Sequence, residues 1–190
     1  DFVLYKKSGY YLNKRPIGKR FDFVTSPEIS QIFGEIIGVY LLYYWKEKIN
    51  AKFNLVELGP GNGTLFKDIE RTCQILPDFI YNANVVLIEI NKELKKIQEM
   101  KLNYFKKTKI KWSKSLNLKS RLPSIIYSNE FFDCFPVRQF LYNNNLWFEK
   151  YVDFNKKENR HYSIYKRVNS KKLLDYLSKY KNKKIYEVSY

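Results

Sequence analysis

The chain has 190 residues, and its 35 Lys and Arg against 19 Asp and Glu give a formal net charge of +16. Its 45% apolar and 18% aromatic residues are typical of a folded domain and not of a disordered basic tail, and its lysines are too dispersed to predict specific nucleic-acid binding. The chain has only two cysteines, Cys73 and Cys134, and one histidine, His161. This content excludes a disulfide scaffold and a typical structural zinc site, so no metal is expected. No apolar run approaches the roughly 20 residues that span a bilayer.

A long helix is the first element that the sequence predicts, from Pro27 to about Lys48. Thr25 with Glu28 fits a capping box, and Ser26 before Pro27 fits an N-cap with proline at the first helical position. Apolar residues at three- and four-residue spacing predict one buried face, made of Ile29, Ile32, Phe33, Ile36, Ile37, Tyr40, Leu41 and Tyr44. Gly34 and Gly38 allow the close approach of either another backbone or a ligand.

Strand and helix patterns alternate from residue 53 onward. Short apolar strands are expected at 53–58, 84–89, 109–112 and 124–128, with helices over 64–76 and 92–100 between the first three strands. This alternation predicts a parallel sheet with right-handed crossovers. Ligands of such sheets bind at the carboxyl ends of the strands, so the site is expected at that edge.

The loop after the first strand reads Gly59-Pro60-Gly61-Asn62-Gly63-Thr64. A dinucleotide fingerprint requires glycine where Thr64 stands, and the lysine of a Walker-type loop is absent, so this loop suits a nucleoside better than a pyrophosphate. Glu57, just before the loop, supplies an acceptor for an ammonium group, directly or through water. Glu89, which closes the second strand, can accept hydrogen bonds from both ribose hydroxyls.

An acid, three alternating glycines and a second acid resemble the pattern of S-adenosylmethionine-dependent methyltransferases. Four ordered motifs, at residues 9–11, 22–35, 56–65 and 129–137, narrow the resemblance to the MidA family, which includes the mitochondrial protein arginine methyltransferase acting as complex I assembly factor 7. The resemblance implies an α/β, Rossmann-like class I methyltransferase fold with S-adenosyl-L-methionine as cofactor. For the mitochondrial members it implies symmetric dimethylation of an arginine in a complex I subunit, in the mitochondrial matrix; a bacterial member would be cytoplasmic.

The resemblance also implies which residues contact the cofactor. These are Thr25, Ser26, Gly34, Glu57, Gly59, Gly61, Gly63 and Glu89. The segment 25–34 is expected to close over the cofactor from outside the sheet, because a helix N-terminus carries N–H groups that suit the methionyl carboxylate. Family members are longer, so the chain is expected to be a fragment, truncated at the C-terminal end of the fold.

The acceptor site is expected directly after the fourth strand, at Asn129, Glu130 and Asp133. An acceptor arginine is planar and always charged, so carboxylates must hold it and direct one nitrogen at the methyl group. Glu130 and Asp133, three residues apart, would share a face of a helical turn; the alternative is a helix cap or a surface pair. Phe131, Phe132 and Phe135 are expected in the core or in a pocket wall.

The last third of the chain predicts a β insertion. Residues 137–142 and 146–154 bracket Asn143-Asn144-Asn145 as a hairpin, 160–167 adds a strand, and 170–181 is helical. The expected organisation is therefore an N-terminal lead-in and helix over 1–50, a cofactor-binding core over 51–136, and the β insertion with a helix and a strand over 137–190. Two function classes stay open: an enzyme that methylates arginine in a protein substrate, with or without a homodimer, and a non-catalytic assembly or binding module that retains the fold.

Overall fold

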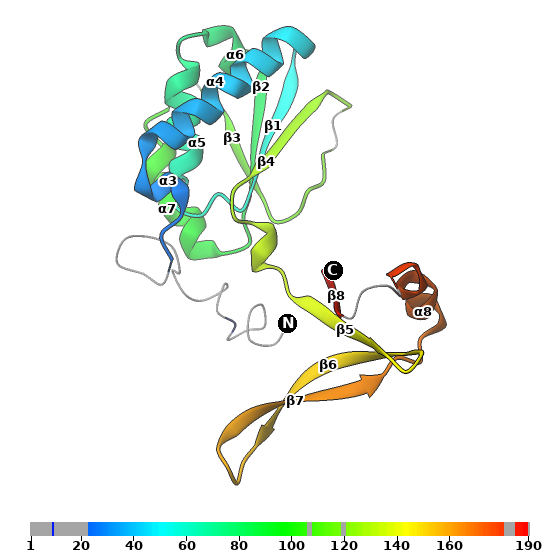
Figure 1. Cartoon of the computed structure of the whole chain (residues 1–190). Coiled ribbons are helices and arrows are strands. Elements are labelled where there is room, and N and C mark those ends of the chain that lie inside the picture. The colour runs from blue at the N-terminus through cyan, green and yellow to red at the C-terminus, as the bar shows by residue number, and fades with distance from the viewer. Residues whose placement is uncertain (1–8, 10–22, 106–107, 119–120, 181–184, 190) are drawn as a thin grey trace. The chain divides into compact units, whose positions relative to one another are not determined.

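The computed structural model describes residue 9 and residues 23–105, 108–118, 121–180 and 185–189 (Figure 1). The chain forms two compact units, one ending at Asp133 and one beginning at Cys134. The division falls just before the boundary expected after residue 136. The motif at residues 9–11 lies outside the described residues, apart from Gly9.

The first unit is built on a four-stranded parallel sheet with the order β3-β2-β1-β4. Its strands are β1 (Phe53–Leu58), β2 (Ala83–Ile88), β3 (Ile110–Ser113) and β4 (Ser124–Ser128). The chain runs outward from β1 to β3 and then returns to the other side of β1, so the strand order reverses between β1 and β4. This reversal is where ligands bind in open α/β sheets, and the predicted α/β parallel fold is confirmed.

The helices of the first unit are α3 (Ser26–Ile29), α4 (Gln31–Lys48), α5 (Thr64–Cys73), α6 (Pro77–Asn82) and α7 (Lys92–Leu102). Helices α4 and α5 pack side by side (Figure 1). Aromatic rings join α4, β1 and α6 in the core: the Phe79 ring lies 5.6 Å from that of Trp45 and 5.1 Å from that of Phe53. Among the described helices, none combines the length and the apolar character that a membrane crossing requires.

The long helix predicted from Pro27 is interrupted at Ser30. Ser30 has an extended backbone, with φ −142°, and its side chain caps α4 by accepting a hydrogen bond from the Ile32 amide at 3.3 Å. The predicted capping box is wrong, because the Thr25 side chain makes no capping hydrogen bond. The Glu28 carboxylate instead accepts a hydrogen bond from the hydroxyl of Thr64, at the start of α5.

The buried face of α4 differs from the predicted one. Five of the eight residues expected in the core are exposed: Ile29, Ile32, Ile36, Tyr40 and Tyr44. The fully buried stripe is Gly34, Gly38, Leu41 and Trp45. Because α4 is apolar around most of its circumference, helical spacing did not identify the inner face. The inner face is the one that carries the glycines, where α5 approaches so closely that a Cβ on Gly38 would lie only 3.0 Å from the Cβ of Thr72.

The second unit contains a four-stranded antiparallel sheet with the order β7-β6-β5-β8. Its elements are β5 (Val137–Asn143), β6 (Leu146–Asn155), β7 (Arg160–Arg167), α8 (Lys171–Leu177) and β8 (Ile185–Ser189), with short 3₁₀ helices η1 (Phe132–Cys134), which spans the division, and η2 (Ser178–Tyr180). The predicted hairpin is confirmed, and its turn residues Asn144 and Asn145 have φ of 46° and 61°, as a two-residue hairpin turn requires. Phe140, Trp147, Val168 and Leu177 form a small core.

Candidate functional site

The glycine loop begins where β1 ends, at the carboxyl edge of the parallel sheet. Gly59, Gly61 and Gly63 have φ of 61°, 55° and 73°, a left-handed conformation that glycine adopts without a steric cost. The Gly59 amide donates to the carbonyl of Ile88 at 3.0 Å, and the Gly63 amide donates to the carbonyl of Pro60 at 2.8 Å. These bonds tie the loop to β2 and close it into a tight turn that leads into α5.

Glu57 lies on β1, just before the loop, and is only 2% exposed. Burial raises the pKa of its carboxyl to about 8, a hydrogen bond from Tyr127 opposes this rise, and the neighbouring Glu89 adds to it. The Tyr127 hydroxyl donates to Glu57 Oε2 at 3.3 Å, because the β1–β4 register places the two residues side by side. A buried carboxyl of this kind ionises readily only when a cation or further donors approach it.

Glu89 follows β2 and is held through both carboxylate oxygens. The Asn91 amide donates to Oε1 at 2.8 Å, and the Gln98 side chain donates to Oε2 at 3.2 Å. Burial raises the pKa of Glu89, and these hydrogen bonds act against the rise. The strand-end carboxylate is therefore fixed in orientation at the edge of the sheet that carries the glycine loop.

Gln98 belongs to the same arrangement and was not predicted from the sequence. It lies on α7, is completely buried, and also donates to the carbonyl of Gly61 at 2.7 Å. Leu94, Gln98 and Leu102 form the buried stripe of α7. A single polar residue on an otherwise apolar stripe was the signal that would have revealed it.

The segment before α4 lies beside the glycine loop. Glu28 accepts hydrogen bonds from the Asn62 side chain at 3.4 Å and from Thr64. Thr25 and Ser26 are half-buried at the start of this segment, and their contact with a cofactor stays a prediction.

Gly34, also expected at the cofactor, packs against α5. A Cβ at this position would lie 2.6 Å from the Cβ of Asp68. This contact favours the helix-packing alternative for Gly34.

The expected acceptor residues follow β4. Glu130 is exposed and has a φ of 49°, and Asn129 donates to its carboxylate at 3.4 Å. Asp133 is exposed in η1, which begins only at Phe132, so the two acids do not share a helical turn as predicted. Phe131, the residue after Glu130, lies against Gly59, where an added Cβ would overlap its ring. This contact brings the segment after β4 to the glycine loop. Phe132, also expected in the core or in a pocket wall, is instead exposed.

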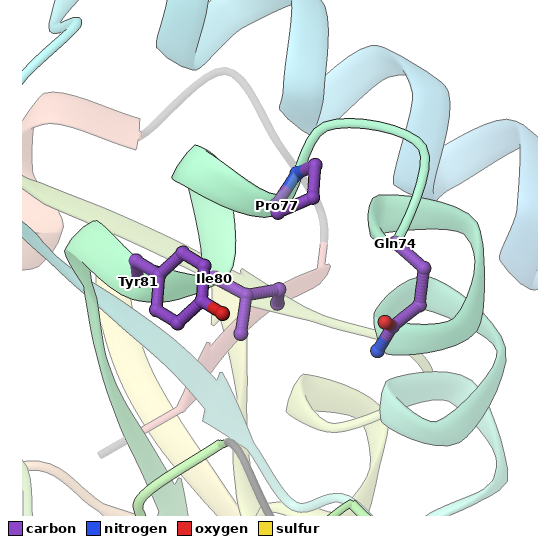
Figure 2. A pocket seen from close by; sticks show the side chains of 4 residues that line it. All are labelled: Gln74, Pro77, Ile80 and Tyr81. Carbon is purple, nitrogen blue, oxygen red and sulfur yellow. The ribbon is translucent and has the colours of Figure 1, made fainter.

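A separate small hollow lies between α5 and α6 (Figure 2). Its volume is about 90 Å³, and its lining is Gln74, Pro77, Ile80 and Tyr81. These residues follow the C-terminal end of α5, whereas the glycine loop precedes its first turn. Since ligand pockets usually measure roughly 300 to 1,000 Å³, the hollow is too small to compete with the loop as a ligand site.

The residues at the carboxyl edge fit a nucleoside that carries an ammonium group. Glu89 presents fixed acceptor oxygens for hydroxyls, Glu57 is a buried acid that a cation would ionise, and the loop between them has no side chain at three of its positions. Such a loop allows a ligand to approach the backbone closely.

Comparison with known proteins assigns the family. A model of the family described as "putative S-adenosyl-L-methionine-dependent methyltransferase" matches residues 36–189. The human mitochondrial protein arginine methyltransferase NDUFAF7 is 36% identical over 167 residues, covering 76% of this chain and 38% of that protein. The Drosophila melanogaster homologue is 32% identical over 169 residues, covering 77% of this chain and 38% of that protein. The chain thus spans about two-fifths of the length of these relatives.

Solved structures agree at the level of the fold. A Burkholderia thailandensis protein bound to S-adenosyl-homocysteine superposes with a TM-score of 0.73 at 21% identity, covering 93% of this chain and 46% of that chain. A native crystal structure from the same organism superposes with a TM-score of 0.71 at 19% identity. The parallel sheet, the glycine loop between two strand-end acids and the family match over most of the chain lead to one conclusion: this chain belongs to the S-adenosyl-L-methionine-dependent methyltransferase family that its motifs indicated.

Proposed function

We propose that this chain binds S-adenosyl-L-methionine at the carboxyl edge of its parallel sheet and provides the methyl-transfer site of a protein arginine N-methyltransferase. The observation that carries the proposal is a pair of acids around a left-handed glycine loop: Glu57 lies on β1, and Glu89 directly follows the adjacent strand β2. The MidA resemblance extends it to the assembly of respiratory complex I and, for a eukaryotic protein, to the mitochondrial matrix. The names of the relatives, which are called mitochondrial protein arginine methyltransferases, support the activity and the mitochondrial location.

Each residue has a separate task in this proposal. When bound, the cofactor supplies an electrophilic methyl group on its sulfonium. Glu89 accepts the ribose hydroxyls, Glu57 faces the ammonium group, and the backbone of the loop lies against the nucleoside. Methyl transfer is an in-line displacement, so orientation of the two reactants accounts for most of the acceleration.

The acceptor side of the proposal rests on Glu130. A left-handed backbone costs a residue other than glycine roughly 1 to 2 kcal/mol, and Glu130 adopts it at φ 49° directly after β4. Residues held in such conformations cluster at functional sites. Its exposed carboxylate would hold the guanidinium of an incoming arginine, with Asn129 and Asp133 beside it in sequence.

Binding of S-adenosylhomocysteine, measured by isothermal titration calorimetry, tests the cofactor part. Glu89→Ala should weaken the affinity by about 1.5 to 3 kcal/mol, the range for hydrogen bonds to a charged group. The matched control is Glu93→Ala, an exposed acid on α7 that pairs with Lys96, and it should bind as the wild type does. Unchanged affinity in a folded Glu89→Ala protein would contradict the proposal.

Transfer of labelled methyl groups to arginine-containing proteins tests the acceptor part. Glu130→Gln should abolish transfer while changing cofactor affinity by less than about 1 kcal/mol, a small loss beside that of a charged hydrogen bond. Glu158→Gln, an exposed acid that pairs with Arg160 in the second unit, is the control. An equal loss of cofactor binding would assign Glu130 to the cofactor, and full activity would make it structural. A wild type that binds cofactor without transferring methyl groups would favour the non-catalytic assembly module.

A further inference from the structure

We propose that Gln98 is a positioning residue that joins the glycine loop to the ribose-binding carboxylate and sets the selectivity of the site for the ribose hydroxyls. The inference rests on the proposed function, since it concerns the same cofactor site. Its basis is a hydrogen-bond network that links α7, the loop, the end of β2 and β3 through one buried amide.

Both donor positions of the Gln98 amide are used. Nε2 donates to the carbonyl of Gly61 at 2.7 Å and to Glu89 Oε2 at 3.2 Å. A primary amide has two N–H groups, so these two bonds exhaust its capacity. One rigid, planar group therefore holds the middle glycine of the loop and the strand-end acid at a fixed separation.

Trp112 on β3 determines which way the amide faces. The indole N–H can only donate, and it donates to Gln98 Oε1 at 2.9 Å. In the flipped orientation the amide oxygen would face two acceptors, and its NH₂ group would face the indole donor. The network therefore has a single satisfied arrangement.

The consequence for Glu89 is preorganisation. The Asn91 amide holds Oε1 and Gln98 holds Oε2. The Ile90 amide also donates to this carboxylate. Because a carboxylate offers about four acceptor positions, Glu89 keeps capacity to accept a ribose hydroxyl without reorienting. The stem of Gln98 also lies under the loop, since a Cβ on Gly63 would be 3.3 Å from Gln98 Cγ.

Packing alone does not require glutamine at this position. Leu94 and Leu102 flank it on the buried stripe of α7, where an apolar side chain would fill the space without the cost of burying an amide. The hydrogen-bond partners of Gln98 explain why this position is polar, since all of them lie at the cofactor edge of the sheet.

A comparison of two ligands isolates this role. S-adenosylhomocysteine and its 2′-deoxy analogue are titrated into the wild type, Gln98→Met and Gln74→Met. Methionine keeps the length of the Gln98 side chain and removes its hydrogen-bond donors. The matched control is Gln74, which donates to Glu70 at 2.8 Å and lies outside the glycine loop. We expect the wild type and Gln74→Met to prefer the ribose ligand by about tenfold or more, as for a charge-assisted hydrogen bond. In Gln98→Met the preference should fall to about threefold or less.

The outcomes separate the inference from the function beneath it. Equal weakening of both ligands by Gln98→Met, with the preference retained, would make Gln98 a purely structural residue and overturn the inference alone. No binding by the wild type would overturn the proposed function and the inference together. If Gln98→Met does not fold, Trp112→Phe keeps the aromatic packing and removes the donor that orients the amide. It should reduce the ribose preference, and an unchanged preference would contradict the network.

Discussion

The carboxyl of Glu57 gives the protein a pH-dependent stability. Burial raises its pKa from 4.5 to about 8, so between these values the folded state binds more protons than the unfolded state. The contribution of this group is therefore complete below about pH 4.5 and is lost as the pH rises through 8. Relative to the wild type, Glu57→Gln should gain stability as the pH rises from 5 to 9, by up to about 4 to 5 kcal/mol.

Urea unfolding over a pH series measures this gain. The control Glu93→Gln removes an exposed acid of α7 that pairs with Lys96, so it shows how much of the pH dependence follows from the loss of any surface carboxylate. A pH-independent difference for Glu57→Gln would contradict the raised pKa.

Gly59 combines two constraints that substitution can separate. Its φ of 61° is costly for alanine, by roughly 1 to 2 kcal/mol, and an added Cβ would overlap the ring of Phe131. Gly59→Ala should therefore destabilise the chain more than the backbone cost alone. Adding Phe131→Ala should restore the part of the unfolding free energy that was lost to steric overlap. A double-mutant cycle should therefore show a coupling between the two substitutions of about 1 kcal/mol or more. Strict additivity of the unfolding free energies would show that the two residues are not in contact.

At the scale of elements, the packing of α4 on α5 depends on small side chains. A Cβ on Gly38 would lie 3.3 Å from the Cα of Ile69 and 3.0 Å from the Cβ of Thr72. Gly38→Leu should push the helices apart and cost about 1 to 3 kcal/mol, as overpacking does. Ile36→Ser, at a side chain that is 63% exposed on the same helix, should change stability by less than about 0.5 kcal/mol. Thermal unfolding of the two variants tests the assignment, and a reversed order of costs would contradict it.

For the whole molecule, the net charge of +16 has a consequence that no single site produces. Dispersed cations attract any polyanion without reading its sequence. The chain should bind two unrelated DNA duplexes with equal, weak affinity, and this affinity should decrease by at least tenfold between about 50 and 200 mM salt. Fluorescence anisotropy measures both properties. A marked preference for one duplex at the higher salt concentration would contradict the expectation that specific nucleic-acid binding is absent.

The sequence by itself determined the local elements around the site. The strand that ends in Glu57, the glycine loop, the second strand before Glu89 and the hairpin at Asn144 are encoded within short segments. Their determinants are local: alternation between strand and helix patterns, and backbone conformations that glycine and asparagine adopt at low cost. For this reason both the parallel fold and the edge that carries the site could be predicted before any contact was known.

Only the tertiary structure decided which side chains meet at that edge and which face of α4 is buried. Tyr127 reaches Glu57 from 70 positions away in the sequence, and Gln98 reaches Gly61 from 37. Likewise, α4 is apolar on more than one side, and its inner face was selected by the close approach of α5 to Gly34 and Gly38. Such contacts depend on how one element packs against another, and the periodicity of a single element does not contain that information.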